Sequence, residues 1–400
     1  MLKLDYVPEP KPVTSDYTVA CHYYPGWSKN CGSRKNGFDA IQDFPERTPL
    51  MGYYDEADPE VTDWEIKWAV EHGINCFVYC WYRKDGTMGT PVTRDLLHLG
   101  HAIHDGLFHA KYQKYIQFAI MWECGACEPA KDSADLTENL LPFWVNEYFS
   151  KENYLKIDGK PIVFVYGPTR MVETIGSEEN CRAALEACNE KIREYGFPGI
   201  HFSTMENGWN KTNIPFFQEH GYEEFSAVEK SKRCGFDSGF QYNWHYNINL
   251  LSPEQRAEYE ITRRVPEDII VDYQLASIRT RVEHYPDYFM YTASVMWDRT
   301  PWYPDPDPND IIAQFQLSPE NWRKLLKGVR EIIETLPQDS IGRKIVMIDN
   351  WNEWAEGHYV SPCAEHGFGY LQAIREELTH RDNLPDYRLP SSIGRGPYLK

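Results

Sequence analysis

The stretch KIVMIDNWNEWAEGH, residues 344–358, joins a nearly continuous apolar run to a dense cluster of polar and acidic side chains. The run Lys344–Trp351 has the composition of a strand that is buried on both faces. Strands of this kind belong to parallel sheets that are covered by helices. The polar cluster begins where the strand is expected to end, so the stretch predicts an α/β fold with functional groups at the carboxyl ends of its strands.

Seven other segments are rich in β-branched and aromatic residues in the same way. With Lys344–Trp351 they make eight predicted strands: Tyr17–Tyr24, Asn75–Tyr82, Tyr115–Trp122, Pro161–Tyr166, Ile200–Met205, Tyr222–Val228 and Tyr288–Trp297 are the others. Helices are expected between them. The clearest is Pro319–Leu336, with Ser318 as its cap and apolar residues at spacings of three and four. The others are Pro59–His72, Leu136–Phe149, with an interruption at Pro142, and Arg182–Tyr195, capped by Ser177 or Asn180.

Eight strands that alternate with helices predict an α/β fold, a closed (β/α)8 barrel of the TIM type. An open doubly wound sheet is the alternative, but no G-x-G-x-x-G turn follows the first strand. Long loops at Ser28–Ala57, Glu229–Asn249 and Asp298–Ile311 are expected to form a rim. We expect residues 1–16 to be an extended N-terminal segment, 17–380 to be a single catalytic domain and 381–400 to be a C-terminal tail.

The composition argues against a nucleic-acid-binding protein and against a membrane-spanning one. The chain has 400 residues with 41 Lys and Arg against 60 Asp and Glu, a formal charge of −19, which argues against nucleic acid as a partner. No apolar run is long enough for a membrane span, and the N-terminus lacks the apolar core of a signal peptide. The sequence as it stands predicts a cytoplasmic protein, although a removed export signal would leave the same sequence. Tyr, Trp and Phe make 14% of the chain, enough to build ligand clefts.

Glu353 and Glu356 are the predicted catalytic residues. In a continuing strand their side chains would point to opposite faces, but a helical turn after Asn352 would let both face one cavity. Trp351 and Trp354 flank them and are expected to keep the site partly dry. Two neighbouring carboxylates in such a site do not both ionise easily, so the pKa of one should rise. A pair of carboxylates is the basic equipment of a glycosidase.

Aromatic and polar side chains at the other strand ends are expected to bind a sugar. The predicted substrate-binding residues are Tyr23, Tyr24, Trp81, Tyr82, Trp122, Glu123, Tyr166, Glu206, Trp297, Arg299, Asn352 and Trp354. Glu123 and Glu206 are also reserve candidates for catalysis. Arg299 at the rim suggests a sulfated or uronic sugar. No metal or cofactor is expected, because no H-E-x-x-H, P-loop or EF-hand sequence is present.

The run Trp351–Gly357 resembles the signature of the glycoside hydrolase family 99-like proteins, also called the WbsX-like family. The resemblance covers about residues 17–374. Further matches are Tyr23–Pro25, Ala57–Glu60, Glu71–Ile74, Phe77–Tyr82, Gly159–Pro161, Trp297–Asp298 and Gly367–Leu371.

The resemblance implies a metal-free (β/α)8 barrel that cleaves α-mannosides internally with retention, through a 1,2-anhydro sugar. By this likeness Glu353 would be the base that acts on the 2-hydroxyl. Glu356 would be the acid that protonates the leaving oxygen and then the base that activates water. The chain departs from the family pattern at four positions, which weakens the case for mannose while leaving the carboxylate pair intact: Arg299, Ala355, Ser361 and Cys363.

Three functions are therefore open at this stage. The first is a retaining glycoside hydrolase that acts on an oligo- or polysaccharide. The second is a glycosyltransferase of polysaccharide biosynthesis, for which the Asp305-Pro306-Asp307 run is weak support. The third is a carbohydrate-binding protein without catalysis. All three take a carbohydrate partner, and the sugar, its linkage and the oligomeric state stay open.

Overall fold

The computed structural model describes residues 5–28, 34–206, 225–304 and 310–398. Eight parallel strands run in the order β10–β14–β1–β2–β4–β6–β7–β8. Their bounds are β1 Thr18–Tyr23, β2 Cys76–Arg83, β4 Gln117–Glu123, β6 Lys160–Tyr166, β7 His201–Met205, β8 Ser238–Phe240, β10 Tyr291–Ser294 and β14 Ile345–Asp349. Gly239 of β8 bonds to the backbone before β10, at Tyr288 (3.0 Å) and Met290 (2.9 Å), and this closes the barrel. The predicted (β/α)8 fold is confirmed.

One predicted strand is wrong. Residues 222–224 lie outside the described part of the chain, and Phe225–Arg233 form helix α5. The sixth barrel strand is instead β8, inside the segment 229–249 that was expected to be a rim loop. A strand of three residues with a glycine at its centre is too short to show a pattern.

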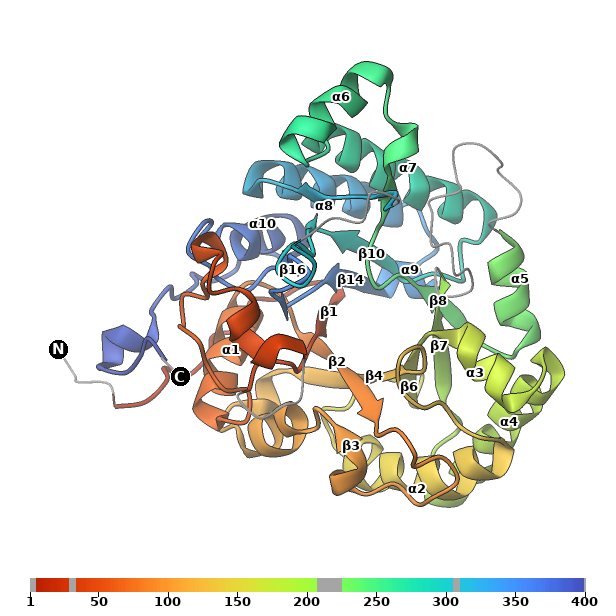
Figure 1. The fold of residues 1–400 in the computed structure, drawn as a ribbon. Helices are drawn as coiled ribbons and strands as arrows, with labels where there is room; N and C mark the ends of the chain where they lie inside the picture. The colour runs from red at the N-terminus through yellow and green to blue at the C-terminus, as the bar shows by residue number, and fades with distance from the viewer. Residues whose placement is uncertain (1–4, 29–33, 207–224, 305–309, 399–400) are drawn as a thin grey trace.

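Helices surround the strands, as Figure 1 shows. They are α1 Pro59–Glu71, α2 Leu141–Trp144, α3 Pro168–Ile175, α4 Glu178–Lys191, α5 Phe225–Arg233, α6 Pro253–Thr262, α7 Glu267–His284, α8 Pro319–Ile333, α9 Ile341–Lys344 and α10 Gly369–Leu378. Asp58 and Ser318 cap α1 and α8 as predicted, and Ser177 is the cap of α4. Around α2, π-helical turns cover Asp135–Leu140 and Val145–Phe149, so the helical path continues past Pro142.

Short strands shape the loops: β3 Leu97–His98, β5 Lys156–Ile157, β9 Tyr246–Asn247, β11 Met296–Trp297, β12 Ile312–Ala313, β13 Phe315–Gln316, β15 Asn352–Glu353 and β16 His358–Tyr359. The two ends of the chain lie on the same side of the barrel (Figure 1). The backbone of Val13 bonds to Val70 of α1 (3.0 Å), and the indole of Trp68 bonds to the carbonyl of Arg388 (3.1 Å). None of the described helices combines the length and apolar character needed to cross a membrane.

Candidate active site

A β-hairpin follows the last barrel strand and carries both predicted catalytic residues. Strands β15 and β16 pair antiparallel, with Glu353 opposite His358, and residues 354–357 form the turn. The expected helical turn is therefore a hairpin turn, which reverses the chain just as well. Glu353 sits on the first strand and Glu356 in the turn, so their side chains return to the same place.

The two carboxylates lie close together. One oxygen of Glu353 and one of Glu356 are within 4.8 Å of each other and of a ring nitrogen of His358. Glu353 is 2% exposed, while the side chain of Glu356 is 23% exposed. Burial raises the pKa of Glu353 well above its usual range, and the charge of Glu356 raises it further. Among the described residues, no Arg or Lys forms an ion pair with either acid.

His358 connects Glu356 to a third acid. Its Nε2 lies 3.2 Å from Oε2 of Glu356, and its Nδ1 makes a short hydrogen bond to Asp349 at the end of β14. The ring packs between Trp297 and Tyr242, with centroids 5.4 and 5.5 Å away. Burial would lower the pKa of His358, but Asp349 and Glu356 outweigh burial and raise it to about 10. The imidazole is therefore a cation at neutral pH.

Arg47 holds the turn of the hairpin through hydrogen bonds to its backbone and to Asp298. Nη1 of Arg47 donates to the carbonyls of Trp354 and Asp298, both at 3.0 Å, and Nη2 lies 2.6 Å from the Asp298 carboxylate. The backbone N–H of Asp298 donates to the carbonyl of Glu356 at 2.8 Å. Gly357 completes the turn with a φ of +73°, where a Cβ would lie 2.7 Å from the carbonyl oxygen of Asp298.

Asn352 holds the other side of the hairpin. Its amide nitrogen donates to Glu56 at 3.0 Å, and its amide oxygen accepts from the backbone N–H of Tyr24 at 2.9 Å. The indole of Trp351 donates to Glu65 of α1 at 3.0 Å. Asn352 is fully buried in these contacts, so it positions the hairpin and does not reach a substrate in this conformation.

Four of the predicted sugar-binding residues have rings near the carboxylates or at the rim above them. Tyr82 and Tyr166 are half-buried, and burial together with the nearby acids raises the pKa of both hydroxyls. Trp297 packs on His358. Tyr24 is half-buried and packs at the rim against Trp302, 6.1 Å between ring centroids. Aromatic rings suit stacking on the apolar face of a sugar, so these four residues stay the candidate sugar-binding residues.

Other predicted rings have their contacts away from the two carboxylates, and their role in binding a sugar stays a prediction. Tyr23 donates to Glu65 of α1 (2.9 Å), and Trp81 donates to Tyr148 (2.9 Å). Trp122 packs on Trp144 of α2, 5.2 Å between centroids. Trp354 packs on Tyr359 and donates to Tyr54. Trp351, expected to shield the carboxylates, packs on Phe77. These rings fill the layer between barrel and outer elements.

The reserve acids and Arg299 each have a structural partner. Glu123 accepts backbone N–H bonds from residues 125–127, at 2.7 to 3.0 Å, and so organises the loop after β4. Glu206 pairs with Arg281 of α7 at 2.9 Å. Arg299 pairs with Asp310 and lies over the ring of Tyr303, so its charge is balanced and does not by itself indicate an anionic sugar.

Sequence reasoning missed several residues of the site. His358, Asp349 and Tyr242 were not among the predicted site residues, although His358 and Asp349 lie within the quoted stretch. Glu353 and His358 are paired across the hairpin. A predicted hairpin in place of a helical turn would therefore have placed His358 beside the acids. Asn350 joins the group, because its amide donates to the Tyr242 hydroxyl at 2.7 Å.

Glu353, Glu356 and His358 are close enough to share an ion. Nε2 of His358 lies 3.2 Å from Glu356, and its Nδ1 bonds to Asp349, an arrangement that is also found behind histidines in metal centres.

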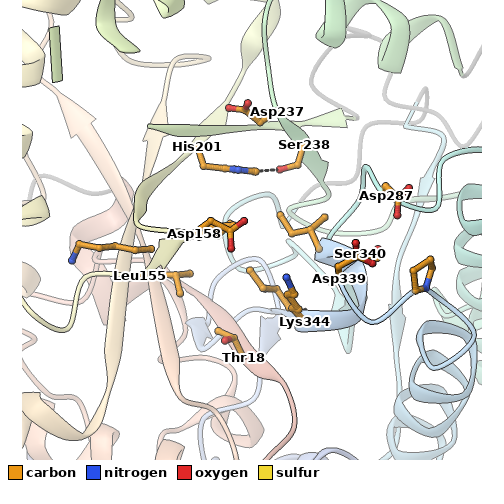
Figure 2. A pocket seen from close by; sticks show the side chains of 15 residues that line it. Thr18, Leu155, Asp158, His201, Asp237, Ser238, Asp287, Asp339, Ser340 and Lys344 are labelled. Carbon is orange, nitrogen blue, oxygen red and sulfur yellow. Dashed lines mark hydrogen bonds between the residues drawn. The ribbon is translucent and has the colours of Figure 1, made fainter. Parts of the chain in front are cut away.

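A cavity of about 650 Å³ lies at the opposite, amino-terminal end of the strands. Figure 2 shows His201 and Ser238 joined by a hydrogen bond, 2.7 Å long, with acidic side chains spread around the opening. This end of a barrel normally serves stability, and the carbohydrate chemistry is expected at the other end. The cavity therefore does not compete with the hairpin as the catalytic site.

Comparison with solved structures identifies the class of fold. A glycoside hydrolase-like protein superposes with a TM-score of 0.59 at 15% identity, covering 94% of this chain and 98% of that one. A GH99 endo-α-mannosidase from Bacteroides thetaiotaomicron gives 0.56 at 15% identity, covering 90% and 95%. The fold is that of the glycoside hydrolase barrels.

The sequence comparison then gives the family. The model described as glycosyltransferase WbsX matches residues 127–374, more than half of the chain, and the chain belongs to this family. The resemblance found in the sequence is thus confirmed. A curated relative, the uncharacterized protein WxcX of Xanthomonas campestris pv. campestris, is 23% identical over 380 residues. The match covers 90% of this chain and 48% of that protein, so the chain spans about half the length of this relative.

Proposed function

We propose that this protein is a retaining glycoside hydrolase that cleaves an oligo- or polysaccharide with Glu353 and Glu356. The observation that carries the proposal is the pairing of the two carboxylates, with oxygens within 4.8 Å and no Arg or Lys partner among the described residues. Carboxyl groups about 5–5.5 Å apart are typical of retention, whereas inversion needs room for a water molecule. The barrel of residues 17–380 would be the catalytic unit.

The family resemblance implies a two-step reaction through a 1,2-anhydro sugar, which a close pair of carboxyl groups can carry out. In the first step one carboxyl gives its proton to the glycosidic oxygen as the C1–O bond breaks, and the other takes the proton of the 2-hydroxyl while O2 bonds to C1. In the second step water attacks C1 and the C1–O2 bond opens. The proton of water passes to the first carboxylate, and the second carboxyl returns its proton to O2. Two inversions at C1 give net retention.

The test is a screen of the purified protein against neutral, sulfated and uronic oligosaccharides, with product configuration read by NMR. We expect release of product with the configuration of the substrate. Glu353→Gln and Glu356→Gln should each lower kcat by about 10³-fold or more on the natural linkage, because general acid–base catalysis alone contributes about 10²–10⁴-fold. Glu331→Gln, exposed on α8 beside Lys327, is the matched control and should leave kcat unchanged. Near-normal turnover in both active-site variants would contradict the assignment.

The description of the family favours a second candidate, transfer of a sugar to an acceptor other than water. The Asp305-Pro306-Asp307 run, which would bind a metal–nucleotide in such an enzyme, lies outside the described residues. Titration calorimetry with nucleotide sugars separates the two candidates. Binding of a nucleotide sugar without hydrolysis of any glycan would favour the transferase, and binding of glycans without turnover would favour a carbohydrate-binding protein.

A further inference from the structure

Two buried cysteines meet where helix α4 contacts the end of helix α5. Cys181 lies in the first turns of α4, and Cys234 follows directly after the last residue of α5. The two helices are neighbours on the outside of the barrel (Figure 1). Both side chains are fully buried, and the thiol of Cys181 donates a hydrogen bond to the sulfur of Cys234. Neither cysteine takes part in the proposed reaction.

The chain segments that carry the two cysteines are also in direct contact. Nε of Arg182 donates to the carbonyl of Arg233 at 2.7 Å, and its Nη2 donates to the carbonyl of Lys232. Arg233 pairs with Glu178 at 2.7 Å. A Cβ at Gly235 would lie 3.5 Å from the Cα of Arg182. These contacts hold the two segments at the close approach that a disulfide requires, about 4.4–6.8 Å between Cα atoms.

The surroundings of the two thiols make them unequal. The hydrogen bond from Cys181 lowers the pKa of Cys234, and the charges of Lys230 and Arg233 add to this effect, while burial opposes it. Cys188, further along α4, is also fully buried, but burial alone raises its pKa and no other cysteine contributes. Because the thiolate is the form that attacks a disulfide, Cys234 is the sulfur that reacts first.

We propose that Cys181 and Cys234 are a disulfide site, which links α4 to the end of α5 when the protein meets a disulfide oxidant. The sulfur of Cys234 attacks one sulfur of the oxidant R–S–S–R, and the first R–S⁻ leaves with the proton of Cys234. The sulfur of Cys181 then attacks Cys234 and releases the second R–S⁻, which takes the proton of Cys181. Two thiols of the protein are oxidised to one S–S bond, and the oxidant is reduced to two thiols.

The crosslink is expected to stabilise the barrel next to its shortest parallel strand. It closes a loop of about 50 residues, and a disulfide that closes a loop of this length restricts the unfolded chain strongly. Only residues 235–237 separate Cys234 from β8. The strand β8 should therefore gain more protection from the crosslink than strands on the far side of the barrel. This inference does not depend on the hydrolase assignment.

The first experiment maps the disulfide directly. The purified full chain is incubated with oxidised glutathione, with and without urea below the unfolding transition, because the buried contact must open for exchange. Mass spectrometry of peptides before and after reduction then identifies crosslinks. We expect a linked pair of peptides that contain Cys181 and Cys234 and that separate on reduction. Both residues found as free thiols or as separate glutathione adducts in both conditions, or joined to other cysteines, would overturn the proposal.

The second experiment compares thermal unfolding of the oxidised and reduced protein. The Tm of the wild type should rise by about 5 °C on oxidation. Cys181→Ser and Cys234→Ser should each abolish this rise, whereas Cys188→Ser, the matched control on the same helix, should keep it. Hydrogen exchange at residues 238–240 should slow in the oxidised wild type and stay unchanged at 117–123. A rise in Tm that persists in Cys181→Ser or Cys234→Ser would rule out this pair as the site.

Discussion

Asp298 balances the charges of two arginines beside the hairpin turn of residues 354–357. Arg47 lies 2.6 Å and Arg264 2.7 Å from the same carboxylate oxygen. Burial would raise the pKa of Asp298, but the two arginines outweigh burial and lower it. A carboxyl with a lowered pKa in the folded state stabilises the protein above its unfolded pKa of about 4, and this stability is lost as the pH falls through the folded value.

Arg47→Met should lower the free energy of unfolding by about 3 kcal/mol at pH 7, because it leaves a buried carboxylate with one partner fewer. The loss should shrink as the pH falls below about 4. The control is Arg323→Met, whose half-exposed pair with Glu376 spans 3.5 Å and should contribute less than about 1 kcal/mol. Urea unfolding between pH 3 and 7 measures both. Equal losses in the two variants would show that Arg47 does not support the turn.

The raised pKa of His358 predicts a loss of stability at high pH, opposite in direction to the effect of Asp298. Its pKa is raised to about 10 from an ordinary value near 6.5, so its contribution is complete below about pH 6.5 and is lost as the pH rises toward 10. The wild type should therefore lose stability across this window. His358→Gln should be less stable at pH 6 and should flatten the limb. Thermal unfolding from pH 6 to 10 tests this, and a limb of unchanged slope in the variant would contradict it.

At the scale of elements, alternation along the strands explains why some of the predicted rings have their contacts away from the two carboxylates. Neighbouring residues in a strand point to opposite faces. Tyr23 and Tyr24 were predicted together, as were Trp81 and Tyr82, although the second of each pair lies toward the carboxylates or the rim and the first meets the helix layer. The residue types were informative, but the face could not be assigned until the register of the barrel was known.

The hairpin β15–β16 depends on Gly357. Alanine there would face a left-handed φ of +73° and a Cβ 2.7 Å from the Asp298 carbonyl oxygen, so the turn must move. We expect Gly357→Ala to cost about 1–3 kcal/mol and to lower kcat at least 10-fold. Gly86→Ala is the control, since Gly86 has a similar φ of +79° with nothing within 4 Å of the added Cβ. Comparing unfolding and turnover of the two variants separates backbone strain from close approach. Equal effects on turnover would count against this account of the turn.

At the scale of the whole molecule, the sequence predicted the barrel because seven strands are long enough to show buried runs. The remaining strand, β8, could not be recognised from the sequence, because Ser238–Phe240 is too short to show a pattern. The acid pair was predictable from Glu353 and Glu356 alone. The positive charge of His358 beside this pair could not be predicted, because it depends on the contact between His358 in the hairpin and Asp349 at the end of β14.

Closure of the barrel rests on a close approach at Gly239. A Cβ there would lie 2.8 Å from the ring of Phe289 and 2.9 Å from that of Tyr288. Gly239→Ala should cost about 1–3 kcal/mol through overpacking and should open the seam between β8 and β10 first. Hydrogen exchange should rise at residues 238–240 and 291–294 and stay unchanged at 117–123. A uniform rise over all three segments would mean that the seam is not the weak point.

Both acids belong to one tight loop, and this has a consequence for how the chemistry can diverge. The distance between Glu353 and Glu356 is set by the backbone torsions of the hairpin and hardly depends on the diameter of the barrel. Lengthening the segment 354–357 by a single residue should move the two acids apart and admit a water molecule between the sugar and the base. A homologue or engineered form with such an insertion is expected to release the opposite anomer, without any change in residue type.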